Sequence, residues 1–461
     1  MAHIVCLTSG LTGILHASFE LVARLQAEGH RVTYGTPRAV AERVAAQGID
    51  YVQLPPIASD PAPPLPTLHR PLRRLKRLWY QLRHARQRRQ TAFDKLNSED
   101  IAEKLQALQP ELLIIDVELH EYILTAFGQR TPLLLLSQWF SLWKRPGLPY
   151  LLHDTVPGRG WRGQPLAIRW AWWQVRLQRW YQFQKKWWRS LGCNRRTVLR
   201  QLARKVGFPM RYIRSNYWPG PFTYDELPVI SMTAAEMEFP HPHRPNLHYV
   251  GPMVSAGRQE SRKDQESEQR LERLFEQKRR TGAALIYCSV STLHKGDEQF
   301  LQNISQAVAG REDWILILGL GGLLDTAFLE PLPTNVHPFS WVPQLKVLEQ
   351  ADCSINHGGI HTINECLHFR VPMLVYSGKR SDQNGCAARV DYHQLGIMAD
   401  KDTDTAADIR SKIEAVLSTP KYVANMDTMH GHYQAYKGQR KLEEVVRVCL
   451  ASGQNQGLIL A

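Results

Sequence analysis

Residues 339–389 read FSWVPQLKVLEQADCSINHGGIHTINECLHFRVPMLVYSGKRSDQNGCAAR, in which short apolar runs alternate with polar loops. An apolar strand is expected to end at Asn356, the tripeptide His357-Gly358-Gly359 follows it, and a helix is expected to begin near Thr362. Glycines let the backbone approach a ligand closely, and the free N–H groups at a helix start favour a phosphate. The pattern predicts a nucleotide-type phosphate site, with His357 as a donor. A purely structural glycine turn is the alternative, because it has the same pattern.

Other polar and aromatic side chains of this run are suited to the rest of a nucleotide sugar. Glu365 lies one helical turn beyond His361 and can accept hydrogen bonds from ribose or sugar hydroxyls. Trp341 offers a flat face to a base. Asp382 and Gln383 follow the next expected strand, where polar side chains can hold a sugar.

The same alternation of strands and helices continues on both sides of this run and predicts two α/β domains. Strands alternating with helical segments indicate doubly wound, parallel sheets. In the C-terminal half the expected strands are 284–288, 314–318, 335–337, 353–356 and 372–376; in the N-terminal half they are 3–8, 31–34, 111–116 and 132–136. The polar stretch 255–282 between the halves reads as a linker with a solvated helix. Two such domains imply a cleft between them, a common place for a ligand.

The net charge of +14 in 461 residues is unevenly distributed. Residues 61–93 contain nine Lys and Arg, residues 155–224 contain fifteen, and neither segment contains Asp or Glu. The remaining chain therefore has a charge of −10. A uniformly basic nucleic-acid-binding protein would not have this distribution, so no nucleic-acid partner is expected.

Both basic segments also place apolar residues at helical spacing. In the second segment the stripe comprises Trp170, Trp173, Leu177, Trp180, Gln184 and Trp187, with arginines and lysines between them. A basic helix with a Trp/Leu face is typical of a helix lying in a membrane interface, and anionic lipid attracts its cations. We therefore expect contact with an anionic membrane or a lipid substrate. The alternatives are an ordinary core stripe beside a solvated face, or electrostatic binding of nucleic acid.

Cysteine usage and hydropathy narrow the class of protein further. The seven cysteines are odd in number, scattered and without a Cys-x-x-Cys pair, so neither a disulfide framework nor a zinc site is expected. This pattern favours a reducing, cytoplasmic compartment. Residues 1–9 lack a basic leader, so no signal peptide is expected. No run reaches the roughly 18 apolar residues that a spanning helix needs.

The run 339–389 resembles the nucleotide-sugar signature of the family 1 glycosyltransferases, the UDP-glycosyltransferases of GT-B fold, which include macrolide, carotenoid and sterol enzymes. The resemblance is carried by the following residues, in order: Trp341-Val342-Pro343-Gln344, His357-Gly358-Gly359, Thr362, Glu365, Val371-Pro372 and Asp382-Gln383. Weaker similarity extends over most of the chain, at residues 29–34, 249–252 and 288–292.

The resemblance implies a role for each matching residue. Trp341 would stack on uracil, and the Val342 backbone would bond the base edge. Gln344 and Glu365 would hold the ribose. Asp382 and Gln383 would hold the donor sugar, which in this family is most often glucose. The diphosphate would be held by His357, the Gly359 backbone and Thr362, with Ser289 and Thr292 nearby. The family uses no metal or further cofactor, because these donors stabilise the departing UDP.

The sequence departs from the family pattern at the general base. Counting from Gly29-His30 places Ile14 where the family has its histidine, and His16 follows two residues later. We predict that His16 is the base and that Asp116 orients it. Glu118, His120 and Glu121 are substitutes if His16 is not the base. Two further departures lie near the donor sugar. Cys386 stands where the family usually has Asn, and His361 stands where it usually has Gly or Asn.

The resemblance implies a GT-B fold of two Rossmann-like domains, with amphipathic helical insertions in the first. We expect an acceptor domain at 1–250, with insertions at 61–93 and 155–224, and a linker at 251–282. A donor domain is expected at 283–430, and a C-terminal helix at 431–461 that returns to the first domain. The expected activity is inverting transfer of a hexose from a UDP-sugar to a lipophilic acceptor, by a cytoplasmic protein attached peripherally to a membrane. The alternatives are a related GT-B enzyme such as an epimerase, or a scaffold that has lost catalysis.

Overall fold

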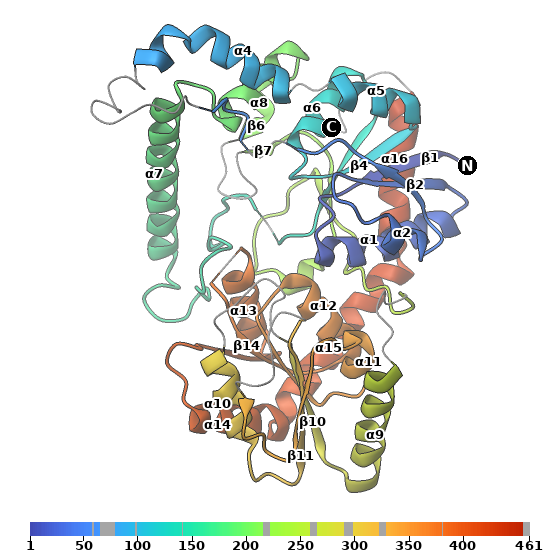
Figure 1. Ribbon diagram of the computed structural model, residues 1–461, viewed down its shortest axis with the longest axis vertical. Helices are drawn as coiled ribbons and strands as arrows, with labels where there is room; N and C mark the ends of the chain where they lie inside the picture. Colours follow the sequence, from blue (N-terminus) through green and yellow to red (C-terminus); the bar gives the residue numbers. More distant parts are fainter. Residues whose placement is uncertain are drawn as a thin grey trace.

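The chain forms two parallel β-sheets, one in each half, and Figure 1 shows the two domains that they build facing each other. The computed structural model describes residues 1–57, 60–64, 79–96, 99–140, 142–214, 222–258, 265–289, 298–321, 329–379 and 381–454. The predicted α/β fold with two doubly wound sheets is confirmed.

The N-terminal sheet has seven parallel strands in the order β3-β2-β1-β4-β5-β8-β9. Its central strands are mostly apolar and are buried because helices cover both faces. The strands are β1 (His3–Leu7), β2 (Arg31–Thr36), β3 (Asp50–Gln53), β4 (Leu112–Asp116), β5 (Leu133–Ser137), β8 (Val229–Ser231) and β9 (Leu247–Tyr249); β6 (Ile213–Arg214) and β7 (Thr223–Tyr224) form a separate ribbon. The helices are α1 (Thr12–Ala27), α2 (Ala41–Ala45), α4 (Ala85–Leu96), α5 (Glu99–Leu108), α6 (His120–Gly128), α7 (Pro165–Ser190) and α8 (Arg195–Lys205), with single turns at Met210–Tyr212 and Ala235–Met237.

The C-terminal sheet has six parallel strands in the order β12-β11-β10-β13-β14-β15. The strands are β10 (Ala284–Ser289), β11 (Trp314–Gly319), β12 (Val336–Phe339), β13 (Cys353–Asn356), β14 (Met373–Tyr376) and β15 (Gly396–Ala399). The helices are α9 (Gln265–Thr281), α10 (Glu298–Val308), α11 (Gln344–Leu348), α12 (Ile360–Phe369), α13 (Gln383–Tyr392), α14 (Ala406–Ser418), α15 (Pro420–Gly438) and α16 (Lys441–Gln454).

The helix α9 packs differently from what its polar composition suggests, whereas the C-terminal helix α16 lies on the first domain as expected. α9, expected as a solvated linker helix, buries Leu271, Leu274 and Phe275 and is thus part of the second domain. Lys278 of α9 reaches Asp352 at 2.6 Å, next to β13. At the other end of the chain, α16 packs on the N-terminal sheet, where Glu443 pairs with Arg24 at 2.9 Å.

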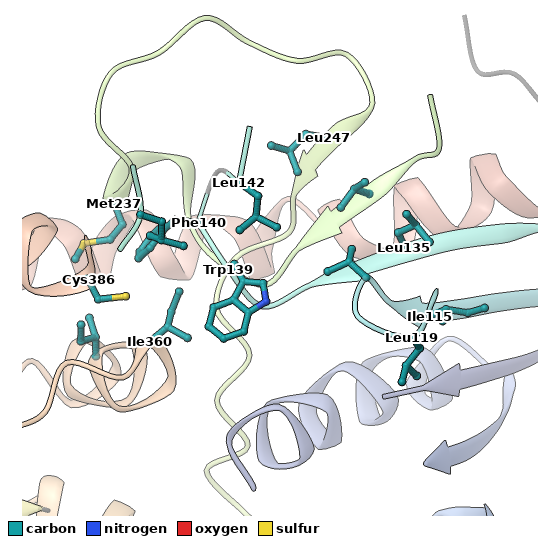
Figure 2. Close-up of a cluster of buried hydrophobic side chains, with 14 of the residues drawn as sticks. Ile115, Leu119, Leu135, Trp139, Phe140, Leu142, Met237, Leu247, Ile360 and Cys386 are labelled. Carbon is teal, nitrogen blue, oxygen red and sulfur yellow. The ribbon is translucent and has the colours of Figure 1, made fainter. Parts of the chain in front are cut away.

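A buried ion pair joins the two domains. Arg389 of α13 donates to Glu238, which lies between β8 and β9 of the N-terminal sheet, through Nε at 2.8 Å and through a second guanidinium nitrogen. The side chains are 1% and 0% exposed. The guanidinium lies 4.5 Å from the ring centre of Phe140 and 4.4 Å from that of Phe239. Figure 2 shows the apolar cluster to which Phe140 belongs, where Phe140 and Met237 of the first domain lie beside Cys386 of the second.

α7 stands at the side of the N-terminal domain, with its first turn toward α13 (Figure 1). Its buried side chains are Ile168, Trp172 and Val175. Four members of the predicted stripe, Trp170, Trp173, Leu177 and Trp180, are 48–58% exposed, so the stripe is not a core face. Within the described ranges, no helix is both long and apolar enough to cross a membrane. Residues 65–78 of the first basic segment lie outside the described part of the chain.

We expect Glu238→Gln and Arg389→Met each to lower the free energy of unfolding by about 3–5 kcal/mol, because each leaves a buried charge without its partner. The double variant should recover much of this loss, since neither charge then remains. Thermal and urea unfolding measure the effect. Asp50→Asn is the matched control, because Asp50 pairs with Arg31 on the surface at 3.7 Å, with both side chains more than 60% exposed. Equal losses for Glu238→Gln and Asp50→Asn would contradict the importance of the buried pair.

Candidate active site

The predicted donor residues gather at the carboxyl-terminal edge of the second sheet. Ser289 at the end of β10 pairs in register with Asn356 at the end of β13. Asn356 in turn pairs with Val375 of β14. The loops that leave these strand ends carry His357 and Asp382, so the parallel topology brings residues far apart in the sequence to one edge.

The His357-Gly358-Gly359 turn leads into α12, and Gly359 is the N-cap residue of that helix. The Gly358 N–H donates to the Asn356 side chain at 2.9 Å, which closes the turn. A Cβ atom at position 359 would lie 2.8 Å from Nε2 of His357, so only glycine lets the imidazole lie against the helix start. Thr362 is half-buried in the first turn of the same helix. This geometry can present N–H groups, an imidazole and a hydroxyl to a phosphate.

The two residues predicted to hold ribose are in contact. Gln344 begins α11 and donates to Glu365 of α12, and it accepts from the Tyr287 hydroxyl at 3.3 Å. The other carboxylate oxygen of Glu365 accepts from Arg258 at 2.5 Å. Arg258 lies in the stretch predicted to be a linker, and the sequence analysis missed it. Trp341 and Val342 lie in the loop before α11, half-buried and buried respectively.

The residues predicted to hold the donor sugar present unsatisfied polar atoms. Asp382 is the N-cap residue of α13 and accepts from the Ile360 N–H at 3.3 Å and from Cys386 Sγ at 3.2 Å. Burial raises the pKa of the Asp382 carboxyl. Among the described residues, Oε1 of Gln383 and Oγ of Ser289 are buried without a hydrogen-bond partner. Buried polar atoms are normally paired, so these two are positioned for a ligand. Thr292 lies outside the described residues.

The predicted base His16 and the residue predicted to orient it, Asp116, have different partners, and no hydrogen bond between described residues joins the two. Nε2 of His16 lies 2.7 Å from the Arg43 guanidinium. Because arginine can only donate, Nε2 accepts and Nδ1 has the proton. Burial and the charges of Arg258, Arg43 and His361 lower the pKa of His16 to about 2. Asp116 is buried and accepts from the N–H groups of Ser9 and Glu118 at 3.2 and 3.1 Å.

Of the three substitute bases, Glu118 has the available carboxylate. Glu121 is paired with Arg195 at 2.7 Å, and His120 is buried with Nδ1 3.1 Å from the Tyr224 hydroxyl. Glu118 is half-buried, and no hydrogen bond to its carboxylate is present among the described residues. Burial and the charges of Asp116 and Asp382 raise its pKa to about 8, against the opposing effect of Arg195. Asp382 belongs to the second domain, so a charge of the donor domain acts on Glu118.

A second contact between the domains lies beside these groups. Nε2 of His361 on α12 lies 2.7 Å from the Gln138 side-chain oxygen, which follows β5. The start of α1 also meets this ring, because a Cβ atom at Gly13 would lie 2.6 Å from His361. The substitution of His361 for the family's smaller residue was noted in the sequence, but its partner could not be identified there.

Comparison with known proteins gives matches to glycosyltransferases. Residues 322–451 match the family model described as erythromycin biosynthesis protein CIII-like, C-terminal domain. The uncharacterized UDP-glucosyltransferase YdhE of Bacillus subtilis is 32% identical over 162 residues, which are 35% of this chain and 40% of that protein. The zeaxanthin glucosyltransferase of Pantoea ananas is 24% identical over 50% of this chain and 51% of that protein. The matched segments thus span about half or less of these relatives' lengths.

A solved structure extends the similarity of the fold to the whole chain. The calicheamicin glycosyltransferase CalG4 superposes with a TM-score of 0.62 at 20% identity, covering 98% of this chain and 99% of that one. The fold is therefore GT-B. The predicted resemblance to the family 1 glycosyltransferases is confirmed.

We expect Gly359→Ala to weaken UDP binding by about tenfold or more, because the added methyl group displaces His357 from the helix start. Isothermal titration calorimetry with UDP measures the affinity. Gly431→Ala is the matched control: it is a glycine-to-alanine change in the same half of the chain, and a Cβ atom there meets nothing within 4 Å. Unchanged affinity in Gly359→Ala would show that the turn does not hold the diphosphate.

Proposed function

We propose that this chain, which combines the GT-B fold with the donor signature of the family 1 glycosyltransferases, transfers a hexose from a UDP-sugar to an acceptor hydroxyl with inversion. The observation that carries this proposal is the edge of the second sheet, where His357, Gly359 and the start of α12 meet the unpartnered oxygens of Ser289 and Gln383. His357, Gly359, the start of α12 and Ser289 fit a diphosphate, and Gln383 fits a sugar hydroxyl. Glucose is the proposed sugar, which the names of two relatives support.

In the proposed mechanism the second domain binds the donor and stabilises the leaving group. Trp341 and the Val342 backbone hold the base, and Gln344 and Glu365 hold the ribose. Arg258 neutralises the Glu365 carboxylate, so that pair keeps the ribose site compact. His357, the Gly359 N–H, Thr362, Ser289 and Thr292 stabilise the charge that develops on UDP as the bond to C1 breaks.

The first domain supplies the proposed base. The base removes the acceptor's hydroxyl proton, and the oxygen attacks C1 from the side opposite UDP. His16, with Asp116 nearby, remains one candidate, but its only lone pair is taken by Arg43 in this arrangement. Glu118 is the other candidate, since no described residue donates a hydrogen bond to its carboxylate and the charge of Asp382 in the second domain acts on it. We favour Glu118 on this geometry.

The test of the proposed function is transfer from a donor panel (UDP-glucose, UDP-galactose, UDP-GlcNAc and dTDP-sugars) to a membrane lipid extract, read by mass spectrometry. We expect a hexosylated product with UDP-glucose. Its absence with every donor, together with no binding of UDP, would favour a scaffold that has lost catalysis.

The pH dependence of kcat/KM distinguishes the two bases. A carboxylate base must be deprotonated, so with Glu118 the rate rises with pH through about 8. With His16 it stays flat between about pH 6 and 9, because that imidazole is already neutral. Glu118→Gln should then lose roughly 100- to 10,000-fold in kcat and His16→Ala much less. A flat profile with the loss confined to His16→Ala would reverse the assignment.

The acceptor is proposed to be lipophilic and to be taken from an anionic membrane surface. Trp170 and Trp173 of α7 stack with ring centres 4.8 Å apart, and both are exposed. Tyr181 and Trp188 continue the exposed aromatic surface, which is 60% and 65% exposed at these residues. Aromatic side chains beside cations suit reversible attachment to a membrane interface.

Flotation with liposomes containing phosphatidylglycerol tests this attachment. We expect the wild type to float with the liposomes and the variant with Trp170, Trp173 and Trp180 changed to Ser to lose most of this binding, because its apolar face is gone. Trp314→Phe in the core of the second domain is the control for loss of a tryptophan. Failure of the wild type to bind, or equal binding by the triple variant, would contradict membrane attachment.

A further inference from the structure

A large cavity lies in the N-terminal domain between α7 and the body of the domain. Its volume is about 1340 Å³, above the roughly 300–1000 Å³ that is usual for small-molecule sites. One part of its wall is apolar and comprises Trp143, Trp172, Val175, Trp180 and Phe183. The cavity is therefore large enough for an extended ligand, and part of its lining suits a hydrocarbon.

The rest of the wall is strongly cationic. Ten arginines and lysines line the cavity, against Asp60 and Asp225 as the acidic residues. Three of the cations are in ion pairs with two carboxylates, Arg195 with Glu121 and both Arg214 and Arg244 with Asp225. The cavity thus keeps an excess of positive charge facing one space.

The cations on α7 and α8 are crowded together. Arg196 lies 4.1 Å from the ring centre of Phe183, and burial together with the charges of Arg200 and Arg179 lowers its pKa to about 10. An anion in the cavity would relieve this repulsion.

A neutral donor in the wall is also without a partner. Trp143 is 8% exposed, and its indole N–H has no hydrogen-bond partner within the described ranges. The Arg244 guanidinium lies 4.2 Å from its ring centre. The wall therefore combines a buried N–H donor, cations and aromatic surface.

We propose that this cavity binds the acceptor as an anionic amphiphile, with a phosphate group held by Arg179, Arg196 and the Trp143 N–H and a hydrocarbon chain along Trp172 and Phe183. This proposal rests on the proposed function and names the class of its acceptor. A neutral carotenoid or sterol brings no negative charge to offset the excess positive charge of the wall, whereas a phosphate-bearing lipid uses both the cationic and the apolar part.

The cavity is connected to the proposed reacting centre through Arg195. This arginine lines the cavity, pairs with Glu121 and acts electrostatically on Glu118. Trp143 lies five residues beyond Gln138, which contacts His361 of the donor domain. A phosphate-bearing acceptor in the cavity is thus held on the side of the cleft where the candidate base Glu118 lies.

Binding of dodecyl phosphate below its critical micelle concentration, followed by tryptophan fluorescence, tests the proposal on the full chain. We expect dodecyl phosphate to bind at least about tenfold more tightly than dodecyl maltoside and dodecyltrimethylammonium, which share its chain. The double variant Arg179→Gln/Arg196→Gln should weaken this binding by about tenfold or more. The matched control is Arg169→Gln/Lys185→Gln, which removes the same charge from α7 at positions that do not line the cavity. It should bind within about twofold of the wild type.

Two further sets of measurements test which kind of phosphate compound binds and provide a second cavity variant in case the first does not fold. Inorganic phosphate and an oligonucleotide are tested in the same way. If either binds as tightly as dodecyl phosphate and loses the same affinity in the cavity variant, the proposal that the ligand is an amphiphile is overturned. If the cavity variant does not fold, Lys144→Gln/Lys186→Gln replaces it, because both side chains are exposed and line the cavity. Equal affinity in wild type and the folded cavity variant would overturn the site.

UDP binding, measured in parallel, separates this proposal from the proposed function. Retained UDP binding and sugar transfer without binding of dodecyl phosphate would overturn the cavity proposal alone. Tight binding of dodecyl phosphate, lost in the cavity variant, without UDP binding or transfer would overturn the glycosyltransferase proposal and leave the amphiphile site standing.

Discussion

The ion pair between Arg389 and Glu238 is the contact on which the arrangement of the cleft depends. Two charges are removed from water at the domain interface, and the guanidinium is enclosed by the rings of Phe140 and Phe239. Such a pair tolerates little displacement, because loosening it exposes one buried charge without its partner. Arg389 belongs to α13, whose N-cap residue is Asp382. The pair therefore fixes the helix that carries the proposed sugar-binding residues relative to the first domain.

The electrostatics of the cleft follow from that fixed geometry. Burial raises the pKa of the Asp116 and Asp382 carboxyls, and burial together with the charges of Asp116 and Asp382 raises that of Glu118. Burial, with nearby positive charge adding to it, lowers the pKa of His16 and His361, which keeps both imidazoles neutral. Groups whose pKa values are pushed in opposite directions are typical of sites that transfer protons. These opposite pKa shifts depend on the domain interface, because Asp382 and His361 belong to the second domain, whereas Asp116, Glu118 and His16 belong to the first.

The strands and the donor signature could be predicted from the sequence because their determinants are local. Apolar runs such as 284–289 form buried parallel strands wherever they lie, and the His-Gly-Gly turn requires glycine for a nearby imidazole. Contacts between residues far apart in the chain could not be predicted. Arg258 lies in a stretch so polar that it reads as linker, and its partner Glu365 is 107 residues away. The apolar face of α9 was missed for the same reason, because only three apolar residues form it within a highly polar stretch.

The positive charge of the segment 155–224 serves two different surfaces. Its helix α7 exposes Trp170 and Trp173 on one side, and it directs Arg176 and Arg179 into the cavity on another. Cations on a solvated face cost little, whereas cations gathered around one cavity repel each other and lose hydration. A bound anion would offset this repulsion and loss of hydration, and would thereby stabilise the cluster of cations around the cavity. The net charge therefore points first to the chemistry of the acceptor, and the membrane from which the acceptor is drawn is a consequence of the same charge.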